Sequence, residues 1–196
     1  MIDDLNFSPG DTDNNLLRKI LGRLGLGLGT GSGLTVSSIL SGSVGGFSEV
    51  VTVAPTVTAA SYSAGNAVGG KQTLANAVRT ASKTAILDSI TLLDRSNSKA
   101  TMEIVIFDSD PSAATITDKT AFVFNTDDLK VLARLSVAAT DYVTINSKAI
   151  VTLKGLGVVV KAASGTSLYA ALITTGTPTF AATTDIQLKY GFLQDA

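Results

Sequence analysis

The 196-residue chain has no cysteine, no histidine and no tryptophan. The lack of cysteine excludes disulfides, thiolate metal sites and cysteine nucleophiles. The lack of histidine excludes Ser-His-Asp triads, HExxH zinc sites, acid–base catalysis by imidazole and haem ligation through histidine. Because these two absences remove most of the common catalytic mechanisms, the sequence predicts a protein that is not an enzyme and that needs no cofactor.

Charged residues are scarce as well. They make up 16% of the chain, whereas roughly 25% is typical of soluble domains. A freely diffusing protein usually carries more charge, because charge keeps it soluble. The composition therefore indicates a surface that is partly covered by partner subunits. A thinly charged monomer is the alternative.

The distribution of charge and hydrophobicity also bears on partners and location. The formal net charge of −1 gives no general attraction to nucleic acid or to anionic membranes. No hydrophobic run approaches the ~20 residues that span a bilayer. The first residues, Met1-Ile2-Asp3-Asp4, are acidic, whereas a secretory signal begins with positive charge. We expect a protein made in the cytoplasm, with neither nucleic acid nor a membrane as its partner.

A short apolar stripe near the N-terminus predicts a helix over residues 15–24. Asn14 or Asn15 is suited to cap its start. About ten residues form a marginal helix in isolation, so this one needs a surface to pack against. That surface belongs either to another subunit, which makes the helix a docking peptide, or to the chain's own domain. The residues of the stripe, our candidates for partner docking, are Leu16, Leu17, Ile20, Leu21 and Leu24.

Glycine is concentrated in residues 22–46, which hold nine of the eighteen glycines in the chain. Such a segment has few side chains to bury and favours a linker or an extended arm. Its alternating glycines superficially suggest a phosphate-binding loop, but no strand precedes them and no GKS or GKT motif follows. We therefore divide the chain into an N-terminal arm with a short helix, residues 1–48, and a body, residues 49–196.

The body consists of short β-branched and aliphatic runs separated by turn signals, a pattern typical of all-β domains. In the last run, residues 185–192, apolar and polar side chains alternate most regularly. Eight to ten short strands predict an all-β domain, an antiparallel two-sheet sandwich of the jelly-roll type. The expected strands are 49–57, 84–93, 101–107, 121–125, 131–138, 142–145, 149–153, 158–162, 168–174 and 185–192.

The densest acidic group of the chain follows the strand expected at 101–107. It comprises Asp108, Asp110, Asp118, Asp127 and Asp128. The Asp-x-Asp pair at 108 and 110 resembles the opening of many divalent-cation sites. The EF-hand pattern is not met, however, because its turn glycine and closing glutamate are missing. We favour a turn in which aspartate side chains accept hydrogen bonds from nearby backbone N–H groups, and we expect no metal site.

Residues 53 to about 125 resemble a family of small virion proteins from tailed bacteriophages. A Leu-Leu-Arg-Lys-Ile-Leu stretch ahead of a glycine-rich segment, as at residues 16–21, also looks like the start of such proteins. The resemblance implies a virion role without fixing the position on the particle, and it brings no catalytic residues. The segments that carry it are Val53-Ala54-Pro55-Thr56-Val57-Thr58, Tyr62-Ser63-Ala64-Gly65-Asn66-Ala67-Val68-Gly69-Gly70 and Phe107-Asp108-Ser109-Asp110-Pro111.

Together these observations predict a structural protein of the virion, made in the host cytoplasm. We expect it to decorate or cement the capsid through its N-terminal arm, with the major capsid protein as its principal partner. A homo-oligomer, for example a trimer, fits the low charge and hides edge strands. The alternatives are a neck, tail or head-fibre component, or a β-sandwich module whose loops bind host glycans with the help of a cation at Asp108 and Asp110.

Overall fold

The computed structural model describes residues 47–194, which form nine strands and two single turns of 3-10 helix. The turns are η1 (Asp128–Lys130) and η2 (Ala139–Asp141), and no helix in this part of the chain is long enough to cross a membrane. The strands are β1 (Phe47–Val53), β2 (Gln72–Leu74), β3 (Thr84–Asp94), β4 (Met102–Phe107), β5 (Val131–Val137), β6 (Val143–Ile145), β7 (Lys148–Lys161), β8 (Leu168–Thr174) and β9 (Ile186–Gln194).

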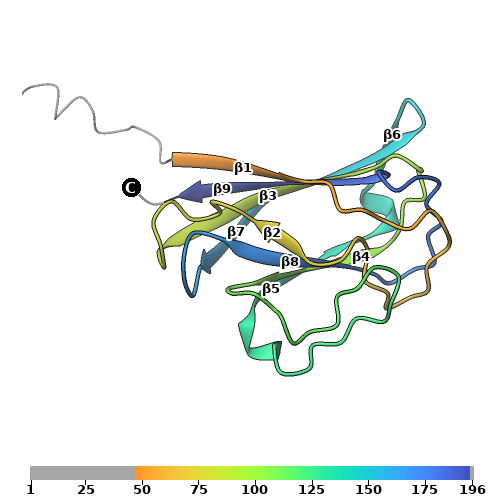
Figure 1. Ribbon diagram of the computed structural model, residues 1–196. Coiled ribbons are helices and arrows are strands. Elements are labelled where there is room, and N and C mark those ends of the chain that lie inside the picture. The colour runs from red at the N-terminus through yellow and green to blue at the C-terminus, as the bar shows by residue number, and fades with distance from the viewer. Residues whose placement is uncertain (1–46, 195–196) are drawn as a thin grey trace, which may run out of the picture. The chain divides into compact units, whose positions relative to one another are not determined.

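The strands form two antiparallel sheets (Figure 1). The first sheet has the order β1-β9-β3-β7-β6, and the second has the order β2-β8-β4-β5. Neighbouring strands often come from opposite ends of the body; for example, all seven residues of β1 pair with β9. The prediction of an all-β body with two antiparallel sheets is confirmed. The predicted helix over residues 15–24 and nearly all of the predicted arm lie outside the described residues, so both stay predictions.

The main hydrophobic core combines side chains from both sheets. Alternation along the strands produces it, because successive side chains of a strand point to opposite faces. In β9 the inner positions are buried almost completely, while Gln187 and Lys189 point away from the core. The alternation predicted for this strand is therefore confirmed. The inner side chains of β9 are Ile186, Leu188, Tyr190 and Phe192.

A second, smaller cluster lies on the outer face of the second sheet. Val105 and Phe107 of β4 and Ala171 of β8 are buried there. The connection between β4 and β5 supplies Ile116, which covers these side chains. The second sheet therefore has buried apolar side chains on both faces, and the long connection keeps this part of the outer face from water.

The strand expected at residues 121–125 is wrong. This segment makes only isolated bridges, to Asn66 and Thr115. Its role is to cover the outer face of the second sheet, where Phe122 packs against the smaller cluster. The β-like composition is thus explained by burial of apolar side chains over a sheet rather than by pairing within one.

The division between the strands expected at 149–153 and 158–162 is also wrong, because both belong to the single strand β7. Gly155 and Gly157 have φ values of 65° and 61°. The facing strand β3 shifts register between Leu87 and Ser89. The glycines therefore accommodate a β-bulge within a continuous strand, whereas the sequence pattern predicts a turn at this position.

Candidate interaction surfaces

The predicted docking residues Leu16, Leu17, Ile20, Leu21 and Leu24 lie outside the described residues. Their predicted role is therefore untested. The remaining candidates from the sequence, the five aspartates, all lie in the connection between β4 and β5 and can be placed one by one.

Asp108 and Asp110 do not point at a common site. The hydroxyl of Ser109 donates to Asp108 Oδ1 at 2.6 Å, and Lys71 Nζ lies 2.5 Å from Asp110 Oδ1. Within residues 47–194, no three carboxylate, histidine or cysteine side chains gather in a way that would hold a metal ion. The pair thus serves local hydrogen bonding and an ion pair with the chain segment before β2.

Asp127 fastens the end of this connection to its beginning. Its Oδ2 accepts hydrogen bonds from the backbone N–H groups of Ala113 and Ala114, both at 2.7 Å. Lys130 Nζ lies 2.8 Å from its Oδ1. The hydrogen bond from Lys130 and those from the two amides lower the pKa of this carboxyl. The carboxylate is therefore a structural acceptor, but its amide donors lie 13 and 14 residues away, so it does not form the local turn that the sequence predicts for the acidic group.

Asp118 fastens the same connection to residues 58–69, a segment distant in sequence. Its carboxylate accepts from the backbone N–H and hydroxyl of Thr58, from Gly69 N at 2.6 Å, and from Tyr62 Oη at 2.7 and 2.9 Å. Burial raises the pKa of Asp118, but these hydrogen bonds outweigh burial and leave the pKa below its ordinary value. Burial and the bond to Asp118 together raise the pKa of Tyr62 to about 12.

The five predicted aspartates are therefore not one site. Asp118 and Asp127 fix the fold of the connection that covers the second sheet, Asp110 forms an ion pair, and Asp128 is exposed in η1. These arrangements hold a loop rigidly in place. Two apolar surfaces among the described residues are also suited to contact another molecule.

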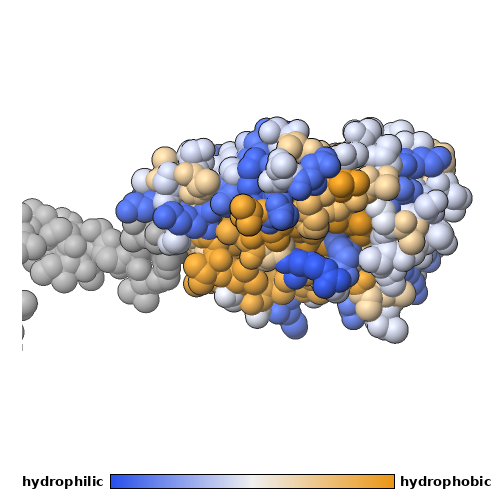
Figure 2. All heavy atoms as spheres, turned by 90° about the horizontal axis from the view of Figure 1, so that it is seen from below, coloured by the Kyte–Doolittle hydropathy of each residue, from blue (hydrophilic) through white to orange (hydrophobic). Residues whose placement is uncertain are grey.

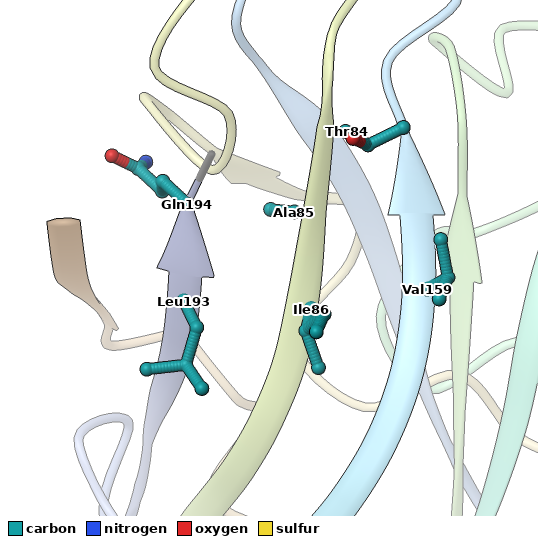
Figure 3. Close-up of a pocket in the computed structure, with 6 residues that line it drawn as sticks. All are labelled: Thr84, Ala85, Ile86, Val159, Leu193 and Gln194. Atoms are coloured by element: carbon teal, nitrogen blue, oxygen red, sulfur yellow. The ribbon is translucent and has the colours of Figure 1, made fainter. Parts of the chain in front are cut away.

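The first apolar surface is a shallow hollow on the outer face of the first sheet (Figure 3). Leu193 of β9 pairs with Ile86 of β3, and Ile86 pairs with Val159 of β7. The three side chains thus form a row across three strands, and Val159 is 67% exposed. Thr84 and Gln194 line the polar end of the hollow.

The second apolar surface is the side of the molecule where β5 and β7 lie. Figure 2 views the molecule from the side on which β5 lies in Figure 1, and apolar side chains gather over part of this face. Leu129, just before β5, is 91% exposed. Several aliphatic residues that pack on the main core remain partly exposed to solvent, namely Leu132, Ala133 and Leu135 of β5 and Leu153, Leu156 and Val158 of β7. We call this set, with Leu129, the β5–β7 side.

Sequence reasoning missed both surfaces, although the sequence holds a signal for the first. Ile86 lies between Ala85 and Leu87, and Leu193 follows Phe192, so both apolar residues occupy outward positions in otherwise alternating strands. An apolar residue at an outward position is the pattern that indicates such a surface. The β5–β7 side has no comparable signal, because it depends on which strands lie at the sheet edges.

The chain matches no protein-family model, no curated protein and no solved structure among those with which it was compared.

Proposed function

We propose that the chain is a non-enzymatic structural protein of a tailed-bacteriophage virion that decorates or cements the capsid. The observation that carries this proposal is the nested order in which its strands pair. β1 pairs with β9, β2 with β8, β3 with β7 and β4 with β5. The first half of the body thus runs antiparallel to the second half as one long hairpin, which is folded over into two sheets.

This nested pairing is the pattern of a jelly roll, in which eight strands form two Greek keys across two sheets. With the three-residue strand β6 set aside, the sheets read β1-β9-β3-β7 and β2-β8-β4-β5. Jelly rolls are common in viral capsid proteins and in lectins, and they also form the metal-binding cupins. The fold by itself does not identify the function, and it supports a virion role only together with the sequence resemblance.

The chemistry of the described residues also fits a role in assembly. The buried carboxylates of Asp94, Asp127 and Asp185 accept backbone hydrogen bonds, which makes them structural groups. Several apolar residues with exposed surface, by contrast, lie together at the hollow and on the β5–β7 side. A protein held by many weak apolar contacts on a repeating surface gains avidity from the number of contacts.

In this proposal the arm, residues 1–48, attaches the body to the particle, with the major capsid protein as its partner. The chain is made in the host cytoplasm and becomes part of the virion. The test is co-sedimentation of the full chain, and of a chain lacking residues 1–46, with particles that lack the protein. We expect the full chain to sediment with the particles and the shortened chain to stay in solution. Equal binding of both would refute attachment through the arm.

Two alternatives make different predictions. A neck, tail or head-fibre component would bind at few positions on each particle, whereas a capsid protein binds over the whole shell. A glycan-binding module would bind to a glycan array and lose that binding in Asp110→Ala. The ion pair of Asp110 with Lys71 occupies the carboxylate that this alternative assigns to a cation.

A further inference from the structure

Two strand edges are open on the β5–β7 side. β5 pairs with β4 alone and is the last strand of the second sheet. On the edge of β7 that faces away from β3, β6 pairs only with residues from Lys148 to Ile150. Within residues 47–194, no strand covers that edge for the remainder of β7. Both sheets therefore end here with backbone donors and acceptors that a further strand would satisfy.

Proteins usually protect such edges, and the other edge strands of this chain show how. β2 and β6 have three residues each, and short strands are poor templates for pairing. β1 carries Glu49 at the same alternation as the buried Val51, and an inward-pointing charge at an edge disfavours further pairing.

Apart from a register shift at its first residues, between Val131 and Ala133, β5 lacks such devices. It has seven residues and contains neither proline nor lysine. Its one charged residue, Arg134, is held by Glu103 of β4 at 2.7 Å. The aliphatic side chains of Leu132 and Leu135 reach this edge while still packing on the core. An unprotected strand edge next to exposed aliphatic side chains is the combination expected of a surface that is covered in the assembled protein.

We propose that the β5–β7 side is the contact between two copies of this chain, with β5 pairing antiparallel to β5 of the second copy. An identical strand is a suitable partner, because antiparallel pairing about a two-fold axis is self-complementary. If the axis passes at Leu135, this residue faces its own counterpart, and the apolar inner face continues from one copy into the next.

The same register also matches the charges. It places Arg134 of each copy opposite Ser136 of the other. The hydroxyl of Ser136 already donates to Glu103 at 3.0 Å. Each arginine therefore approaches a carboxylate of the second copy, whereas an axis at Arg134 would set two arginines opposite each other. A second copy thus supplies a strand, an apolar surface and an opposite charge.

This inference deepens the proposed structural role, on which it rests, by naming a second copy of the chain as a partner. A two-fold contact yields a dimer, in contrast to the trimer suggested from the sequence. The first test is the mass of the full chain in solution by light scattering. A dimer is expected, and either a monomer or a trimer would overturn the proposal.

Two substitutions locate the contact. Leu129→Glu and Leu156→Glu place a charge on the β5–β7 side, at positions that are not buried, and we expect both variants to be monomers. Leu129→Glu is the decisive variant and should keep the circular dichroism of the wild type, because Leu129 is 91% exposed, whereas Leu156 also packs on the core. Val50→Glu on β1 is the matched control, because Val50 is 60% exposed and lies on the strand at the opposite edge of the first sheet. If Val50→Glu dissociated the dimer while the other two variants did not, the contact would lie elsewhere.

Because the chain has no cysteine, a single introduced thiol reports only on contacts between copies. Leu135→Cys is expected to form a disulfide-linked dimer on mild oxidation, and Val50→Cys on β1, at the opposite edge of the first sheet, is expected to remain unlinked. Linking at position 50 without linking at 135 would contradict the proposal. A monomer that still binds particles would refute this contact and leave the proposed function intact. A dimer that does not bind particles would support this contact and refute the proposed function.

Discussion

Tyr190 of β9 donates a hydrogen bond to Gln72 of β2 at 2.9 Å, and this bond joins the two sheets through the main core. Both side chains are almost completely buried, and burial raises the pKa of Tyr190 far above its ordinary value. The Nε2 atom of Gln72 has no hydrogen-bond partner. The two residues therefore depend on each other to satisfy polar atoms that water does not reach.

The first prediction follows from this pair. Tyr190→Phe leaves the Gln72 amide entirely unpaired, and Gln72→Leu leaves the Tyr190 hydroxyl unpaired. Each change should lower the free energy of unfolding by about 1–3 kcal/mol. The double variant removes both polar groups and should lose clearly less than the sum of the two single variants. Urea unfolding of the four proteins measures this, and strictly additive losses would show that the bond does not couple the sheets.

The second prediction concerns Asp118. Replacing Asp118 with alanine removes the acceptor for the N–H groups of Thr58 and Gly69 and for the hydroxyl of Tyr62. At pH 7 the free energy of unfolding should fall by about 1–3 kcal/mol. Asp128→Ala is the control, because Asp128 is an exposed aspartate of the same connection; it should leave the stability nearly unchanged.

The effect of Asp118 should depend on pH. Its pKa in the folded protein lies below the ordinary value of 3.8, so the unfolded chain takes up the proton first as the pH falls. The stabilisation is fully present above the pKa of the unfolded chain and is lost as the pH falls through the pKa of the folded state. The difference between the wild type and Asp118→Ala should therefore shrink below pH ~4. A constant difference down to pH ~2 would contradict the role assigned to the ionised carboxylate.

The third prediction separates two glycines that share a positive φ. Gly65 and Gly69 have φ values of 86° and 74°, yet only Gly69 lies against another residue. A Cβ at position 69 would fall 2.2 Å from Cβ of Pro55, whereas one at position 65 would meet nothing within 4 Å. Gly65→Ala should cost about 1–2 kcal/mol for its backbone conformation alone. Gly69→Ala should cost more, on the order of 3–5 kcal/mol, because the clash adds to that strain.

Thermal unfolding of these two variants provides the comparison. Equal losses would mean that the segment before β2 moves away from Pro55 without cost. In that case the hydrogen bond from Gly69 to Asp118 would not hold this segment rigidly.

The alternation of side chains was sufficient to predict most of the body. The strands observed as β3, β4, β5, β8 and β9 lie at nearly the positions that the sequence predicts, because each is a run of mostly apolar residues that pairs along its length. β2 is not predicted, because its three residues, Gln72–Leu74, do not form a run of β-branched or aromatic side chains. The segment 121–125 has a strand-like composition, but it covers a sheet instead of joining one.

The structural aspartates and the edges were beyond sequence reasoning for a different reason. The hydrogen-bond partners of Asp118 lie 49 to 60 residues away in the sequence, and no local sequence pattern indicates them. Whether β5 is an edge depends on the order of the sheet, which the sequence does not encode locally. The sequence therefore predicted which residues become strands, whereas the surfaces available for contact followed only from their arrangement.

The most direct test of the proposed function is quantitative mass spectrometry of purified particles of the bacteriophage to which we propose that the chain belongs. A capsid decoration or cement protein should be present at a fixed, high ratio to the major capsid protein, and that ratio should persist through density-gradient purification. Presence at only a few copies per particle would contradict a role over the capsid shell and indicate the neck, tail or a fibre. Abundance in infected cells with absence from the particles would contradict a structural role in the virion.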